Sequence, residues 1–234
     1  MSPPLVSVRG LIKHQALRPL RLEALSLARG EVLAIGGVDA QAAELLVGLL
    51  TGALLPDQGE VHLFGQSTSA IADSDAWLRM LDGVGIVTDR AVLIAQFSVE
   101  QNVAMPFTLE VEPIPADVRP RVELLAEEVG IARVALATRV AEATAIVQAR
   151  VRLARALAFE PAVLLLEHPS ASLPREDVRS FAADVGRIGR SRNLAVLALT
   201  ADELFARGLG GERLILEPAT GALRSPGIWR KIWR

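Results

Sequence analysis

The sequence predicts an α/β protein with a largely parallel sheet. Short apolar runs of strand length alternate with helical patterns along the 234 residues, and this alternation is typical of βαβ units. A glycine-rich turn, Gly36-Gly37, lies between one such strand and a helical segment. Apolar residues make up 51% of the chain, which is enough to build a core and argues against disorder.

The first half of the chain is predicted to contain five strands. Turns at Gly30-Glu31 and at 56–59 separate apolar runs, and a helical pattern follows the glycines over 40–54. The strands are expected at 6–9, 22–27, 32–35, 60–64 and 83–87.

The second half is predicted to begin with helices and to return to strands. The pattern over 96–148 is mostly helical, with a proline-rich interruption at 113–115. Two buried strands are expected at 162–166 and 194–199, and a hairpin at 213–217 and 222–223. The helical middle is therefore predicted to be an insert between two parts of one sheet-bearing core.

The composition restricts the classes of function. A formal net charge of −2 provides no basic field for nucleic acid or anionic lipid. The chain has no cysteine, so disulfides and thiolate metal sites are excluded, and we expect no metal site. No apolar run reaches the roughly 18 residues of a membrane span, and the start at Met1 lacks a secretory pattern. We therefore expect a cytoplasmic protein.

The turn at Gly36-Gly37 occupies the place where nucleotide-binding proteins have a phosphate loop. Such a loop needs glycines for close backbone approach, a lysine for the phosphate charge and a hydroxyl for magnesium. The stretch 30–65 resembles the first core strand, phosphate loop and following turn of ABC transporter ATP-binding domains. Under this resemblance the second glycine, the lysine and the hydroxyl residue are replaced by Gln41, Ala42 and Ala43.

Two acidic residues beside this turn are unfavourable for phosphate. Asp39 is predicted to cap the helix, which is worth about 1 kcal/mol and places a carboxylate at the positive end of the helix. Glu44 adds a second negative charge. The alternative is that Gly36-Gly37 is merely a strand-to-helix turn.

A second resemblance covers 162–174, which is similar to the family's apolar strand ending in Asp-Glu-Pro. It implies that Glu167 stands for the magnesium-associated aspartate and His168 for the catalytic glutamate. Pro174 replaces the aspartate of the following loop. A histidine can act as a general base, and the alternative is a structural role for His168.

Three further motifs of the family match with replaced residues. The helix over 148–161 is similar to the one that follows the ABC signature and is the most specific match. Side chains in the signature obstruct close backbone approach. The signature falls on Thr144, Ala145 and Ile146, the Q-loop glutamine on Asp89 and the switch histidine on Ala201. The adenine-stacking aromatic has no clear equivalent, and His14 is the nearest candidate.

The segment 97–107 resembles the run that begins the family's helical subdomain, where the transmembrane partner docks. The resemblance implies a retained docking surface, and the alternative is that the same residues only pack the subdomain. The candidate contacts are Phe97, Val99, Asn102, Met105 and Phe107.

The C-terminal run 229–234 places Trp229 and Trp233 one helical turn apart, with basic residues between them. Such a pattern can lie on a membrane surface or in a partner's groove. The alternative is a tail that packs on its own domain or is disordered.

The resemblance covers nearly the whole chain and implies an ABC-type nucleotide-binding domain. Its P-loop NTPase-like core has a mainly parallel sheet, an N-terminal antiparallel β subdomain and an inserted α-helical subdomain. The domain is expected over 1–224, with a core at about 1–90 and 151–224, a helical subdomain at about 91–150 and a tail at 225–234.

The replaced motifs predict a non-catalytic, pseudo-ATPase subunit that scaffolds or regulates a membrane transport complex. The implied partners are a transmembrane permease and a second ABC ATPase subunit, in a homodimer or heterodimer at the inner face of the membrane. No cofactor is expected. One alternative is a weak ATPase that uses ATP and magnesium. Another is a cleft that binds a different small ligand or a cation, since acidic groups surround it: Asp39, Glu44, Asp89 and Glu167, with His168.

Overall fold

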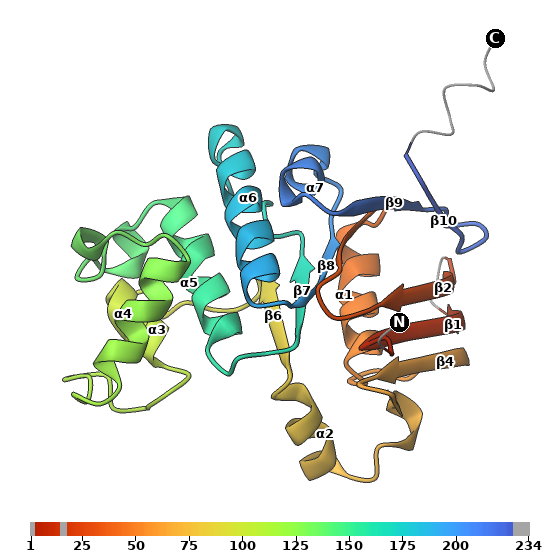
Figure 1. The fold of residues 1–234 in the computed structure, drawn as a ribbon, viewed down its shortest axis with the longest axis horizontal. Coiled ribbons are helices and arrows are strands. Elements are labelled where there is room, and N and C mark those ends of the chain that lie inside the picture. The colour runs from red at the N-terminus through yellow and green to blue at the C-terminus, as the bar shows by residue number, and fades with distance from the viewer. Residues whose placement is uncertain (1–2, 15–17, 227–234) are drawn as a thin grey trace.

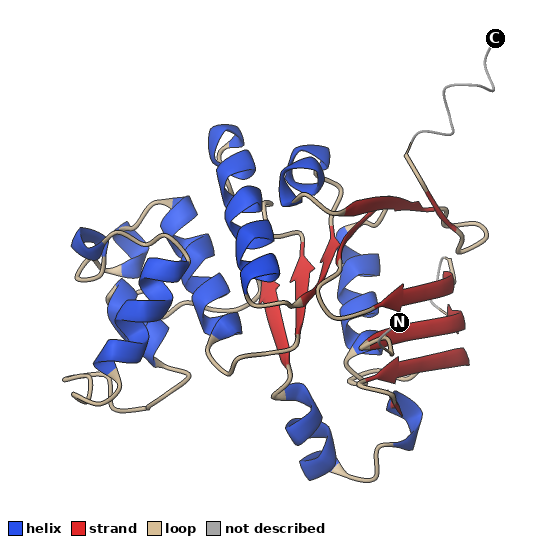
Figure 2. Cartoon of the chain, viewed as in Figure 1, coloured by secondary structure: helices blue, strands red, loops and turns tan. Residues whose placement is uncertain are grey.

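A computed structural model describes residues 3–14 and 18–226. Within this part the chain forms two sheets (Figures 1 and 2). The larger has six strands in the order β10-β9-β3-β8-β7-β6. All its neighbouring strands pair in parallel except β10 with β9. The strands are β3 (Val32–Gly36), β6 (Val84–Thr88), β7 (Val163–Glu167), β8 (Ala195–Leu199), β9 (Glu212–Leu216) and β10 (Leu223–Arg224).

The smaller sheet has four strands in the order β2-β1-β4-β5, and all its pairings are antiparallel. It lies at the opposite end of the molecule from the helices of the middle segment (Figure 1). Its strands are β1 (Val6–Lys13), β2 (Leu20–Leu27), β4 (Gln58–Leu63) and β5 (Gln66–Ser67), and the short helix η1 (Thr68–Ala70) follows them.

The parallel sheet separates two hydrophobic cores. Successive side chains of a strand point to opposite faces, and β7 shows the result. Leu164 and Leu166 belong to the core shared with the middle helices, whereas Val163 and Leu165 belong to the core shared with the antiparallel sheet. Because both faces are covered, every residue of β7 and β8 is buried, which explains their unbroken apolar sequences.

Four helices accompany the sheets. Helix α1 (Ala40–Leu50) buries its apolar stripe in the core on the side of the antiparallel sheet. Helix α6 (Arg175–Ser191) packs on the other face through residues such as Phe181, which is fully buried. The remaining two are α2 (Ser74–Leu81) and α7 (Glu203–Leu209).

The middle segment forms a helical layer at one end of the molecule (Figure 1). Helix α3 begins at a capping box, in which the Ser98 side chain and the Gln101 side chain each accept from the other's backbone N–H. The layer comprises α3 (Val99–Ala104), α4 (Arg119–Glu128), α5 (Ala145–Leu157) and the short helices η2 (Arg133–Ala135) and η3 (Val140–Glu142).

All the predicted strands are present, with ends that shift by a few residues. The prediction of a helix over 40–54 was too long, because Gly52 has a φ of 74° just after α1 ends at Leu50. The prediction that 96–148 is mostly helical was also too generous, since loops separate its short helices. Helices α2, α6 and α7 were not predicted. Across the described ranges 3–14 and 18–226, no helix has the length and apolar character to cross a membrane.

Candidate functional site

The parallel strands end in the residues singled out from the sequence. β3 ends at Gly36, β6 is followed by Asp89, β7 ends at Glu167, and β8 is followed by Ala201 after one intervening residue. Strand pairing aligns these ends, because Glu167 pairs with both Thr88 and Leu199. Ligands of open α/β sheets bind at this carboxyl edge. The fold therefore brings four of the five replaced motifs to one edge.

The N-terminus of α1 is capped by a carboxylate. Asp39 has extended backbone angles, and its side chain accepts a hydrogen bond of 2.8 Å from the backbone N–H of Ala42. The prediction of an aspartate cap is confirmed. Gly37 precedes it with a φ of 76°, and a Cβ there would lie 2.7 Å from the Leu216 carbonyl oxygen, so the turn requires glycine. Ala43 is fully buried in the core below.

Arg90, which the sequence interpretation did not include, lies between two of the predicted site residues. Its Nη2 is 2.5 Å from Glu167 Oε2, its Nε is 3.2 Å from Glu167 Oε1, and its Nη1 is 2.5 Å from Glu44 Oε1. The hydrogen bonds to Glu167 raise the pKa of Arg90. Glu167 is 7% exposed, so the guanidinium compensates a buried carboxylate. We call these three residues the Arg90 cluster.

Asp89 and the two residues after Arg90 are held by arginines of α5. Arg152 Nη1 lies 3.7 Å from Asp89 Oδ1, and Arg152 Nε donates to the Ala91 carbonyl at 3.2 Å. Arg155 Nη1 donates to the Val92 carbonyl at 2.8 Å. Burial and the neighbouring charge of Arg152 lower the pKa of Arg155. The loop 89–92 is thus bonded to the helical layer.

Three of the four carboxylates that were expected to make the cleft acidic have an arginine partner. Glu44 and Glu167 share the Arg90 guanidinium, and Asp89 faces Arg152. Asp39 is engaged at the end of its helix. Among the residues that the structure describes, no group of three or more histidines or carboxylates has metal-binding geometry.

His168 lies directly after β7 with a φ of 41°. Its backbone N–H donates to the Leu199 carbonyl at 2.9 Å. Its Nε2 is buried and has no hydrogen-bond partner within the described part of the chain. Pro174, also singled out from the sequence, precedes α6 as its N-terminal flanking residue.

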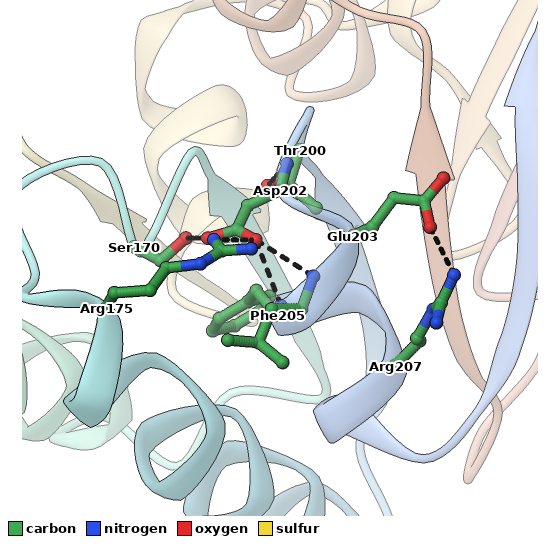
Figure 3. A network of polar contacts seen from close by, with 8 residues as sticks. Ser170, Arg175, Thr200, Asp202, Glu203, Phe205 and Arg207 are labelled. Atoms are coloured by element: carbon green, nitrogen blue, oxygen red, sulfur yellow. Dashed lines mark hydrogen bonds and ion pairs between the residues drawn. The ribbon is translucent and has the colours of Figure 1, made fainter.

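A polar network connects the loop after β7 with the start of α7 (Figure 3). Asp202 accepts from Ser170 Oγ at 3.0 Å and from Arg175 Nη1 at 2.8 Å, and it caps α7 through the backbone N–H groups of Leu204 and Phe205. Burial alone would raise the pKa of Asp202, but these hydrogen bonds outweigh it and lower the pKa. Ala201 lies directly before Asp202 and is exposed.

The signature positions lie on the opposite side of the sheet from α1. Thr144 flanks α5, and Ala145 and Ile146 form its first turn. Ile146 packs against the core of the helical layer, whereas Ala43 of α1 belongs to the other core. Within one chain, these positions and the α1 turn therefore belong to separate regions.

Two of the five predicted docking residues do not reach the surface. Val99 and Asn102 are fully buried. The Asn102 amide bonds the backbone of Ile94 through both its atoms, at 2.9 and 3.1 Å, and so fixes the loop before α3. The docking prediction is wrong for these two residues, whose role is packing. Phe97, Met105 and Phe107 are partly buried against the same core.

A groove of about 440 Å³ lies beside the helical layer, and we call it the Phe159 groove. Phe159 is 60% exposed there, and the sequence interpretation did not single it out. Met105 is the only predicted docking residue that lines it. Other lining residues include Leu81, Ala91, Pro106, Arg152 and Arg155.

A second cleft, of about 360 Å³, lies beside the N-terminus of α1 and is lined by Arg18, Arg21, Gln41, Ala42 and Leu216 among others. His14, the candidate for stacking on a base, is not among its lining residues, and its backbone N–H donates to Asp57. The tail residues Trp229 and Trp233 lie outside the described residues.

The architecture defines the class of protein. A central strand that ends in a glycine turn before a helix, an antiparallel sheet on one side and an inserted helical layer on the other are the parts of an ABC-type ATP-binding domain. The sequence profile described as "ABC transporter" matches residues 21–171. The chain therefore belongs to the ABC transporter family.

Named relatives cover most of the chain. A lipoprotein-releasing system ATP-binding protein LolD of Acinetobacter baylyi is 27% identical over 212 residues, which are 88% of this chain and 92% of LolD. A methionine import ATP-binding protein MetN of Brucella abortus is 30% identical over 206 residues, again 88% of this chain. The chain spans 55% of the length of that MetN.

Solved structures share the fold. A dimeric ATP-binding cassette, MJ0796, bound to ADP and Pi has a TM-score of 0.75 at 19% identity, over 94% of this chain and 98% of its own. The protein cbiO1 of Clostridium perfringens, part of the ABC transporter complex cbiONQ, has a TM-score of 0.75 at 20% identity, over 95% of this chain and 87% of its own.

Proposed function

We propose that the chain is a non-catalytic, ABC-type subunit that scaffolds or regulates a membrane transport complex. The observation that carries the proposal is the N-terminus of α1. Its positive end holds the Asp39 carboxylate. Ala42 and Ala43 occupy the places of the family's lysine and hydroxyl residue, and they supply neither an ammonium nor a hydroxyl group. A phosphate group there would meet a negative charge instead of a cationic partner.

The residues present fit a magnesium nucleotide poorly. A hydroxyl at position 43 would hold the ion in the family, but Ala43 is fully buried and apolar. The carboxylate that would face the ion is Glu167, and it is bonded to Arg90. Gln41 brings a side chain to a position where the family's loop has glycine.

Pairing with another subunit would not restore a complete site. In the family, the phosphate loop of one subunit meets the signature of the other. This chain replaces both elements, so a homodimer has no intact half-site, and each site of a heterodimer includes one replaced element. The alternative is a weakly active ATPase that tolerates these substitutions.

The proposed partners are a transmembrane permease and a second ABC-type subunit, and the proposed location is the cytoplasmic face of the membrane. We assign the permease contact to the Phe159 groove, because it combines an exposed aromatic ring with Met105 at the edge of the helical layer. Exposed apolar surface of this kind is typical of interaction sites. The domain boundaries proposed from the sequence, with the helical subdomain at about 91–150, place this groove where the two parts of the domain meet.

The proposal is tested by calorimetry of the purified chain with magnesium-ATP, from micromolar to millimolar concentrations. We expect no binding. The matched variant Gln41→Gly/Ala42→Lys/Ala43→Ser, with Asp39→Gly added in a second version, should gain affinity if these side chains are the cause. Saturable, magnesium-dependent binding by the unaltered chain would refute the proposal and would require turnover to be measured.

A further inference from the structure

We propose that Arg90 takes the place of a bound ligand as the link between the sheet edge and the helical layer. In this view the loop 89–92 is held from both sides by the chain's own side chains, and the Phe159 groove keeps its shape without nucleotide. The inference rests on the proposed function only for the statement that a nucleotide is replaced. The contacts of Arg90 do not depend on that function.

The first half of the link is the Arg90 cluster. It joins three segments that are far apart in sequence: α1 through Glu44, the end of β7 through Glu167, and the loop after β6 through Arg90 itself. The two bonds to Glu167 have the forked geometry of a guanidinium with a carboxylate, which fixes orientation as well as distance. Two unit negative charges are thus bridged by one cation at the carboxyl edge of the sheet.

The second half of the link comes from α5. Arg152 and Arg155 donate to the carbonyl oxygens of Ala91 and Val92, and Arg152 also faces Asp89. Helix α5 belongs to the helical layer. Together with the Arg90 cluster, its arginines give every residue from Asp89 to Val92 a contact with either the sheet edge or the helical layer.

The wall of the Phe159 groove depends on these contacts. Ala91, Arg152 and Arg155 line the Phe159 groove, and the same residues make the contacts that hold the loop. Loosening the loop would therefore change the wall of the groove. Arg90 itself is not a lining residue, so its substitution tests the link without altering a groove contact.

Amide hydrogen exchange on the full-length chain, without nucleotide, tests the link. In Arg90→Ala we expect exchange over 88–93 to rise by roughly tenfold or more relative to the unaltered chain, as for loss of charged hydrogen bonds. The core strand β8 should stay protected. The matched control is Arg79→Ala, because within residues 3–14 and 18–226 the Arg79 side chain bonds only its own helix, through the Asp75 carbonyl.

Unchanged exchange over 88–93 in Arg90→Ala would overturn the proposal. A rise spread equally over the whole sheet would also overturn it, since that indicates general destabilisation. If Arg90→Ala does not fold, Glu44→Gln decides instead: it keeps the Glu167 contact and is expected to raise exchange over 88–93 by a smaller factor, and no rise refutes the link.

The same measurement with magnesium-ATP separates this proposal from the proposed function. Protection gained on adding nucleotide to the unaltered chain would count against the non-catalytic assignment. The comparison of Arg90→Ala with the unaltered chain, made without nucleotide, would still decide whether the link exists.

Discussion

Arg90 Nη2 lies 2.5 Å from Glu167 Oε2, although 77 residues separate them in the chain. Glu167 ends a fully buried strand, whereas the Arg90 side chain is 51% exposed. The pair therefore connects the interior of the sheet to its surface. A partly exposed cation supplies the charge that a buried carboxylate needs.

Arg90→Ala is expected to lower the free energy of unfolding by about 2 kcal/mol, because it leaves the Glu167 carboxylate buried without a counterion. Adding Glu167→Gln should recover part of the loss, since a neutral amide is less costly to bury. Urea denaturation of the two single variants and the double variant measures this coupling. Strictly additive effects would contradict it.

Asp39→Ala is expected to cost about 1 kcal/mol through loss of the cap on α1. Asp73→Ala is the control, because Asp73 caps α2 in the same way, with a bond of 2.8 Å to Ala76. Helix α2 has no buried residue, so its cap should affect global stability less. If thermal unfolding showed the same loss of stability in Asp39→Ala and Asp73→Ala, the packing of α1 would not explain the cost of losing its cap.

Asn102→Ala is expected to cost about 2 kcal/mol or more, since the buried backbone groups of Ile94 lose their partners. Phe159→Ala should change stability by less than about 0.5 kcal/mol, because the ring is mainly exposed. Chemical denaturation of both variants distinguishes packing residues from surface residues. A large loss in Phe159→Ala would mean that the ring is part of the core.

Asp202 gives a pH dependence with a defined sign. Its folded pKa lies below the ordinary value of 3.8, so its contribution to stability is present above that pH and is lost as the pH falls through the folded value. Asp202→Asn should therefore be less stable than the unaltered chain at neutral pH. The difference should shrink in denaturation experiments at the acid end, and a difference independent of pH would refute this.

Strands β7 and β8 were predictable because burial on both faces leaves a continuous apolar run. Helix α6 was missed although its buried residues Val178, Phe181, Val185 and Ile188 follow a helical period. Its other positions are rich in charge and diluted the pattern. Helix α2 was harder to predict, since it has no buried residue that would mark an apolar face.

The site was predictable only where its contacts are local. Asp39 bonds a residue three positions away, so position alone identified the cap. The partners of Arg90 lie 46 and 77 residues away, and a single sequence gives no sign of such long-range pairs. The burial of Asn102 was not predictable for a similar reason. The residue was named from a resemblance of the segment 97–107, whereas its hydrogen bonds come from the backbone of Ile94, eight residues away.

The ion pairs of Glu44, Arg90 and Glu167 are made within one chain, so their formation is a first-order process. Dilution does not weaken them, and no cellular pool of metal or metabolite sets their occupancy. Ionic strength does affect the ion pair of Arg90 with Glu44, because both side chains are exposed to dissolved salt. The contacts at this sheet edge should therefore weaken as the ionic strength rises, in the manner of a partly exposed ion pair.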